Sequence, residues 1–251
     1  MNNLSVIIIT RNRLEKLKRC VDSVNKVLLG SELVVVDNGS NDGTVDYLNR
    51  WESQKDISAV LLQANKGVAV ARNIGLRKAF CPFIVFIDDD AWIEEIDFNG
   101  IKGYFNDNPL VGIIAPRILY VDGRIQESIR SFPTLLSILW RGTFLHKIFP
   151  NASWYRGYIS HEMESIHETD WAIGACQIIR REVFERIGPY DEKYFFGYED
   201  ADLCRRASRC GYSTMYWPHA RIYHEYARES SKGLNMHLLR HIKSIIRFML
   251  K

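Results

Sequence analysis

The chain has 251 residues, of which 47% are hydrophobic and 25% are charged, with a formal net charge of +3. These values are typical of an ordinary globular protein and exclude a disordered, collagen-like or low-complexity chain, and the small charge argues against a dedicated nucleic-acid-binding protein. The five cysteines form no CxxC pair and the N-terminus has no signal-peptide pattern, so we expect a protein of the reducing cytosol.

The first half of the chain alternates between strand and helix patterns. Continuous apolar, β-branched runs predict buried strands at residues 4–9, 33–36, 57–62 and 83–87. Helical patterns between them predict helices at residues 13–27, 41–51 and 67–80. This alternation indicates parallel βαβ units, and therefore an α/β protein with an open, doubly wound, mainly parallel sheet.

The second half has a mixed pattern. Apolar runs predict strands at residues 111–115, 117–121, 171–179 and 213–217. Helices are expected at residues 199–210 and 237–251. We find no repeat and no Pro/Gly-rich linker, so we expect one composite domain over residues 1–218 and a C-terminal appendage over residues 219–251.

Three acids, Asp88-Asp89-Asp90, directly follow the fourth predicted strand. Such carboxylates repel one another unless a cation or hydrogen-bond donors lie among them. Asp88 and Asp90 share one side of an extended chain, so they can converge on a hard divalent ion such as Mg²⁺ or Mn²⁺. A solvated acidic turn would explain the triplet alone, but the neighbouring motifs favour a metal site.

Other polar residues lie at the same predicted edge of the sheet. Asp37 follows the second strand and is suited to bind a base or ribose, although a turn and helix cap explain it as well. Arg72, near the start of the third helix, suits a diphosphate. Glu199 and Asp200 open a predicted helix, where the helix dipole favours acids and where a general base is the functional alternative. His224 reaches the metal or diphosphate only if the C-terminal segment folds back.

With these residues in view, the chain resembles the family-2 glycosyltransferases, which have the GT-A fold. The motifs that carry this resemblance are VIIITRNR (6–13), VVVDNGSNDGT (34–44), NKGVAVARNIGL (65–76) and FIDDDA (86–91). A later segment, WAIGACQIIRREVFERIGPYDEKYFFGYEDADLCRR (171–206), is similar to the branch that contains rhamnosyltransferases of bacterial cell-surface polysaccharides.

The resemblance implies a role for each matching residue. Those implied to bind the nucleotide and donor are Thr10, Arg11, Asp37, Asn38, Arg72, Asp88 and Asp89. Those implied to hold Mn²⁺ or Mg²⁺ are Asp90, Asp88 and His224. The implied catalytic base is Asp200, with Glu199 as the near alternative. Those implied to lie near the acceptor are Trp171, Gly174 and Ala175.

The implied activity is metal-dependent, inverting transfer of a sugar to a glycan or polyprenyl-diphosphate-linked acceptor in cell-surface polysaccharide synthesis. The resemblance favours dTDP-rhamnose as the donor, followed by a UDP-sugar. Residues 1–115 would be the nucleotide-sugar half and residues 116–218 the acceptor half. A nucleotidyltransferase would need a Gly- and Lys-rich loop after the first strand, which residues 10–13 do not form. A non-catalytic nucleotide-sugar-binding protein would not need the intact acids and Arg72.

The C-terminal segment has a basic and amphipathic pattern. Residues 219–251 carry seven Lys or Arg against two Glu, so this end is basic and the rest slightly acidic. In the predicted helix, apolar and basic residues separate to different sides, which is typical of a helix on an anionic membrane surface. Docking on the protein's own core is the alternative. Residues 132–150 are a second candidate for either role. We expect a cytoplasmic protein, peripheral at the inner face of the cell membrane.

Overall fold

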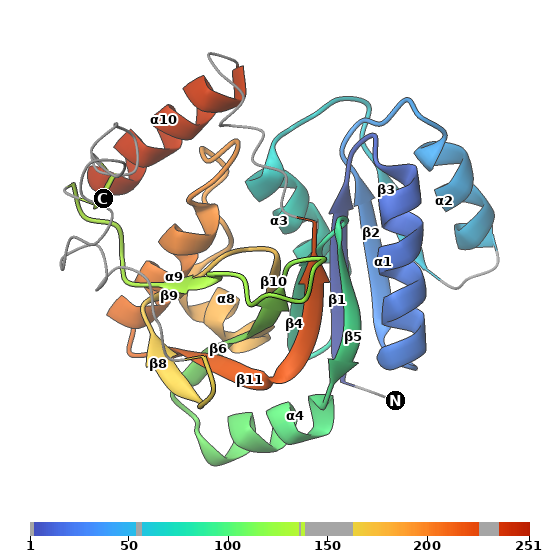
Figure 1. Cartoon of the computed structure of the whole chain (residues 1–251). Coiled ribbons are helices and arrows are strands. Elements are labelled where there is room, and N and C mark those ends of the chain that lie inside the picture. The colour runs from blue at the N-terminus through green and yellow to red at the C-terminus, as the bar shows by residue number, and fades with distance from the viewer. Residues whose placement is uncertain (1–2, 54–56, 136, 139–162, 226–235) are drawn as a thin grey trace.

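A large sheet with helices on both faces forms the body of the protein (Figure 1). The computed structural model describes residues 3–53, 57–135, 137–138, 163–225 and 236–251. The first four strands are β1 (Leu4–Thr10), β2 (Glu32–Asp37), β3 (Ser58–Leu61) and β4 (Phe83–Asp88). The helices between them are α1 (Leu14–Val27), α2 (Thr44–Ser53) and α3 (Val68–Lys78). All four strands are parallel, which confirms the predicted βαβ units.

Most of the remaining strands extend this sheet, with antiparallel pairs except for the parallel pair of β6 and β11. The strands are β5 (Ala91–Ile96), β6 (Val111–Leu119), β7 (Ile129–Arg130), β8 (His167–Thr169), β9 (Trp171–Ala172), β10 (Cys176–Arg180) and β11 (Ser213–His224). The helices are α4 (Phe98–Asp107), α8 (Arg181–Ile187), α9 (Glu199–Arg209) and α10 (Met236–Met249). The strand order is β3-β2-β1-β4-β10-β6-β11-β5, with β8 paired to β11 and a separate β7–β9 pair.

The sheet has a hydrophobic cluster on each face, and each cluster includes residues from a different set of helices. On one face, Leu17 of α1 and Phe105 of α4 pack among buried strand residues. On the other face, Ala71 of α3, Val183 of α8 and Leu203 of α9 do the same. The predicted doubly wound arrangement is therefore confirmed.

Several predicted boundaries in the second half were wrong. One strand, residues 111–119, replaces the two expected at residues 111–115 and 117–121, and residues 171–179 divide between β9 and β10. β11 continues past Pro218 to His224, where we expected a strand end. The register of β11 against β6 shifts between Trp217 and Ile222, and such an irregularity accommodates a proline that cannot donate to the ladder. The sheet therefore includes residues 219–224 of the expected appendage.

Strand register brings the predicted site residues to one edge. Thr10 pairs with Asp37 and Ile9 pairs with Asp88, so the carboxyl ends of β1, β2 and β4 are level. In open α/β sheets, ligands bind beyond these ends. Of the second candidate membrane segment, residues 139–150 lie outside the described part of the chain. Among the described helices, none combines the length and apolar composition that crossing a bilayer requires.

Candidate active site

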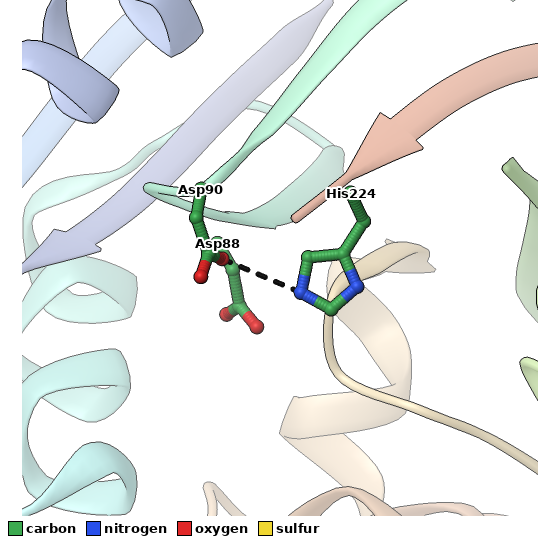
Figure 2. Close-up of side chains that lie close together, drawn as sticks. All are labelled: Asp88, Asp90 and His224. Atoms are coloured by element: carbon green, nitrogen blue, oxygen red, sulfur yellow. Dashed lines mark ion pairs between the residues drawn. The ribbon is translucent and has the colours of Figure 1, made fainter. Parts of the chain in front are cut away.

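Asp88, Asp90 and His224 lie together at this edge and are called the metal cluster below (Figure 2). Asp88 ends β4, Asp90 precedes β5, and His224 ends β11. The register places His224 opposite Ala91, the residue after Asp90, which explains why the imidazole meets this carboxylate. One ligand atom from each of the three side chains lies within 4.8 Å of the others. Two carboxylates and an imidazole form a donor set that fits a divalent cation.

Positive groups surround the acid triplet. Arg13 Nη1 lies 2.8 Å from Asp90 Oδ2 and 3.1 Å from Asp89 Oδ1. Burial raises the pKa of Asp88, and it raises the pKa of Asp89 to about 6. Burial also acts to raise the pKa of Asp90, but the hydrogen bond and charge of His224, with Arg13, outweigh it and lower that pKa. Asp90 is therefore the best-stabilised anion of the three.

Gln126 fixes the orientation of His224. The Gln126 Oε1 atom lies 2.9 Å from His224 Nδ1, and His224 Nε2 lies 3.3 Å from Asp90 Oδ1. Because a carboxamide oxygen only accepts, Nδ1 donates to it, and Nε2 is the nitrogen that faces Asp90. Sequence analysis missed both Gln126 and Arg13. Arg13 stands in the first motif beside the strand end, which was an available signal, but nothing in the sequence points to Gln126.

Arg72 connects the metal cluster to a second pair of acids, Glu199 and Asp200, called the acid pair below. Its guanidinium donates to the Gly174 carbonyl at 2.8 Å, and it forms ion pairs with Asp88 at 3.2 Å and Glu199 at 3.3 Å. Arg72 is almost fully buried. A Cβ at Gly174 would overlap this guanidinium, so glycine permits the close approach. In the described structure, Arg72 thus donates hydrogen bonds to oxygens of the protein itself. The expected contact of Arg72 with a diphosphate stays a prediction.

The acid pair lies at the N-terminus of α9. Gly174 N–H donates to Asp200 Oδ2 at 2.7 Å, and Ala201 N–H donates to Asp200 Oδ1 at 2.8 Å. In contrast, Glu199 Oε2 is buried without a hydrogen-bond partner among the described residues. Burial raises the pKa of both carboxyls. A carboxylate whose pKa rises toward neutral is suited to take a proton at neutral pH.

The residues expected to hold the nucleoside lie at the ends of β1 and β2. Thr10 is buried and donates to Asp89 Oδ2 at 2.8 Å, whereas Arg11 is exposed. Asp37 Oδ2 accepts from two backbone N–H groups in the following turn, while its Oδ1 atom is buried without a partner among the described residues. The Asn38 amide accepts from Lys66 N–H and donates to the following loop. Asn38 therefore organises the approach to α3.

The residues expected near the acceptor lie in β9 and in the turn that joins it to β10. The Trp171 indole donates to the Ser131 carbonyl at 2.9 Å and stacks on Tyr198 with ring centroids 6.5 Å apart. The Ala175 carbonyl accepts from Asp88 N–H at 3.0 Å. Together with the contacts of Gly174, this segment joins the metal cluster to the acid pair.

Comparisons with known proteins fit this geometry. The family model described as glycosyl transferase family 2 matches residues 5–188, and one described as the N-terminal domain of galactosyltransferase matches residues 160–229. The chain belongs to glycosyltransferase family 2. The enzyme class that the motifs implied is thereby confirmed, since matching relatives are also named glycosyltransferases.

Two relatives illustrate the similarity within the family. The N-acetylglucosaminyl-diphospho-decaprenol L-rhamnosyltransferase of Mycobacterium tuberculosis is 26% identical over 230 residues, which cover 86% of this chain and 74% of the relative. The low-salt glycan biosynthesis hexosyltransferase Agl10 of Haloferax volcanii is 28% identical over 214 residues, or 83% of this chain and 62% of the relative.

Solved structures confirm the GT-A fold. GalNAc-T7 with UDP, GalNAc and Mn²⁺ superposes with a TM-score of 0.69 at 18% identity, over 97% of this chain and 47% of that one. S. aureus TarS 1–349 in complex with UDP gives 0.61 at 18% identity, over 89% and 60%. This chain therefore spans about half the length of the GalNAc-T7 chain, and identities this low show a shared fold alone.

Proposed function

We propose that the protein is a metal-dependent, inverting glycosyltransferase that uses a nucleoside-diphosphate sugar. The observation that carries this proposal is the metal cluster joined through Arg72 to the buried acid pair, because transfer needs both a charge-stabilising site and a base. The name of the mycobacterial relative supports dTDP-rhamnose as the first donor to test and a lipid-diphosphate-linked glycan as the acceptor. A UDP-sugar is the next donor, supported by the UDP-bound structural neighbours.

The metal cluster would hold the ion through Asp88, Asp90 and His224 Nε2. When bound, such an ion offsets the charge that develops on a departing nucleoside diphosphate. Mg²⁺ prefers oxygen ligands alone, so the imidazole favours Mn²⁺ of the two expected ions. Because Gln126 Oε1 accepts a hydrogen bond from Nδ1–H, the tautomer with its proton on Nδ1 is favoured, and Nε2 can present its lone pair to the ion.

The base in this proposal is Asp200, which removes a proton from the acceptor hydroxyl. The Gly174 N–H donates to the Asp200 carboxylate and fixes its position. Arg72 in turn donates to the Gly174 carbonyl, so Gly174 itself is held in place. Glu199 remains the alternative because its Oε2 atom has no described partner. For the nucleoside, Asp37 Oδ1 is a buried acceptor without a partner among the described residues, which supports residues 1–115 as the donor half. Residues 116–218 would then be the acceptor half.

Ligand-dependent stability tests the proposal. UDP and dTDP, each with Mn²⁺, Mg²⁺ or EDTA, should be compared in thermal unfolding. A nucleotide at 100 times its dissociation constant adds about 2.7 kcal/mol, so the matching one should raise the melting temperature only with the ion. NMR of the product from the matching sugar nucleotide and a lipid-diphosphate glycan should show an inverted anomeric configuration. Equal stabilisation in EDTA, or a retained configuration, would contradict the proposal.

We also propose that α10 contacts an anionic membrane surface at the inner face of the cell membrane. The structure shows that one side of α10 docks on the protein, with Ser244 and Phe248 buried. The opposite side exposes four apolar residues, Leu239, Ile242, Ile246 and Met249, and together with the exposed Leu250 just after the helix they are called the outer face below. Arg247 and Lys251 form ion pairs with Asp191, so part of the basic charge supports docking. The exposed Lys243 is available beside the outer face.

Replacing Ile242 and Ile246 by Ser should lower binding to phosphatidylglycerol vesicles at least tenfold, because burying each side chain contributes about 1.5–3 kcal/mol. The measurement is co-sedimentation with vesicles, and phosphatidylcholine vesicles report the contribution of lipid charge. Leu29→Ser, which changes an exposed apolar residue after α1, is the matched control and should bind as the wild type does. Equal vesicle binding by the double variant would mean that the outer face does not contact lipid.

A further inference from the structure

The turn before the acid pair has an unusual backbone. Gly197 has φ of 78°, and Tyr198, the N-cap of α9, has φ of 69° and ψ of −3°. The left-handed region is readily accessible to glycine but costs free energy for a tyrosine. Such a conformation persists only where its surroundings specify it. Because Tyr198 directly precedes Glu199, its backbone sets the direction in which the first turn of α9 presents the acid pair.

The surroundings that specify this turn come from α10. The Tyr198 ring centroid lies 5.3 Å from that of His241 and 5.4 Å from that of Phe248. Trp171 stacks on the same tyrosine from the acceptor segment. A Cβ at Gly197 would lie 2.7 Å from His241 Nδ1, so this helix also approaches the backbone of the turn closely.

The described contacts of α10 fasten it to the chain on both sides of the turn. Among them are hydrogen bonds from Arg247 Nε to Asp191 at 2.8 Å, from Ser244 Oγ to the Phe196 carbonyl at 3.0 Å, and from Arg205 Nη2 to the Phe248 carbonyl at 2.7 Å. Two of these partners precede the turn and one lies within α9. Figure 1 shows α10 on the outside of the molecule, beside α9 and away from β1–β3. The helix therefore bridges the two ends of the segment that it covers.

We propose that α10 is a clamp on the active site and that Phe248 is a positioning residue for the acid pair. The proposal rests on the function proposed above. Phe248 holds Tyr198 in its left-handed conformation, and this keeps Asp200 within hydrogen-bond distance of Gly174 N–H. Without the ring, Tyr198 relaxes toward ordinary backbone angles and the first turn of α9 rotates. The metal cluster lies at the ends of β4 and β11, outside the turn and α9, and keeps its geometry.

Phe248→Ala tests the clamp, with Met236→Ala as the matched control because Met236 is an exposed apolar residue of the same helix. We expect kcat for transfer to fall about 10–100-fold, since misplacement by about 1 Å can cost 100-fold. The affinity for nucleotide with Mn²⁺ should stay within about twofold of wild type. Met236→Ala should match the wild type in both. A lower melting temperature with unchanged kcat would overturn the proposal, because that result describes a residue that only packs.

Hydrogen exchange measured on residues 171–176 and 199–203 provides a readout that needs no substrate. Phe248→Ala should speed exchange there while β1 and β4 stay protected, whereas general destabilisation would speed exchange throughout. Hydrogen exchange separates the clamp from the proposed glycosyltransferase function, because faster exchange in these segments would support the clamp even if the protein used no sugar nucleotide as a donor. Exchange at wild-type rates in both segments would overturn the clamp.

Tyr198→Ala keeps the test decisive if Phe248→Ala does not fold. Alanine keeps the cost of the left-handed backbone but has no ring for α10 to hold, so this variant should reproduce the loss of kcat, and Tyr198→Phe should retain activity. Adding Phe248→Ala to Tyr198→Ala should then cause little further loss, because the two changes remove the same contact. Fully additive losses would contradict the coupling.

Discussion

Asp90→Ala should abolish Mn²⁺ binding and, with it, the metal-supported affinity for a nucleoside diphosphate. Asp90 is the acid of the metal cluster whose pKa is lowered, through its hydrogen bond and charge interaction with His224 and the charge of Arg13, so its anionic form is the better stabilised of the two carboxylates. Its removal also leaves His224 Nε2 without its described carboxylate partner. We expect Mn²⁺ affinity to fall by more than 100-fold, because changes to residues outside the ligand shell typically lower metal affinity by about 10–100-fold. Titration of the free protein with Mn²⁺, followed by its electron paramagnetic resonance signal, measures this directly.

Asp89→Asn is the matched control for that variant. Asp89 is the adjacent acid, but its oxygens contact Thr10 and Arg13 rather than the metal cluster. Its loss should therefore change Mn²⁺ affinity less than tenfold. The Mn²⁺ affinity of Gln126→Leu should lie between those of Asp90→Ala and Asp89→Asn. We expect it to be about 10–100-fold weaker than that of the wild type, because the change frees His224 to rotate. The assignment of the ligands fails if Asp90→Ala binds Mn²⁺ as the wild type does. It also fails if Asp89→Asn loses as much Mn²⁺ affinity as Asp90→Ala.

The parts of this fold that could be read from the sequence are those that local pattern determines. The apolar runs of β1, β2 and β4 are nearly unbroken because these strands are covered on both faces, and the polar residues after them mark the site edge. Asp88 and Asp90 could be paired from strand alternation alone. The placement of Glu199 and Asp200 at a helix start could also be predicted, because acids concentrate in first turns.

The remaining features depend on contacts between distant segments. His224 meets Asp90 because β11 continues past Pro218 and pairs with β5, a strand that its short, partly charged sequence did not reveal. Gln126 reaches His224 from the loop after β6, because its N–H donates to the Ile118 carbonyl and β6 pairs with β11. The amphipathic pattern of α10 predicted an apolar and a basic side, but it could not say which side the protein covers. The structure buries Phe248 and leaves Ile242 and Ile246 exposed.

Asp200→Asn should lower the rate of glycosyl transfer about 10²–10⁴-fold, the usual contribution of a general base. Nucleotide and Mn²⁺ binding should stay near wild type, because the metal cluster does not include this residue. In the wild type, burial raises the pKa of the acid pair, so the base gains its proton as pH falls through that raised pKa. The transfer rate should therefore decline as pH falls, at a pH above the ordinary carboxyl value of about 4. Initial rates from pH 5 to 9 with saturating donor measure both effects.

The structure also defines the matched comparison, Glu199→Gln. Both oxygens of Asp200 accept backbone N–H groups, so the amide of an asparagine must point its own N–H₂ at one of those donors. Glu199 Oε2 has no described partner, and a glutamine at this position meets no such conflict. Hydrogen exchange of the Gly174 and Ala201 amides therefore has to accompany the rates, so that a displaced turn is not mistaken for a lost base. Wild-type turnover in Asp200→Asn with loss in Glu199→Gln would transfer the role to Glu199. Wild-type turnover in both variants would place the base outside the acid pair, since neither carboxylate would then be needed to accept the acceptor's proton.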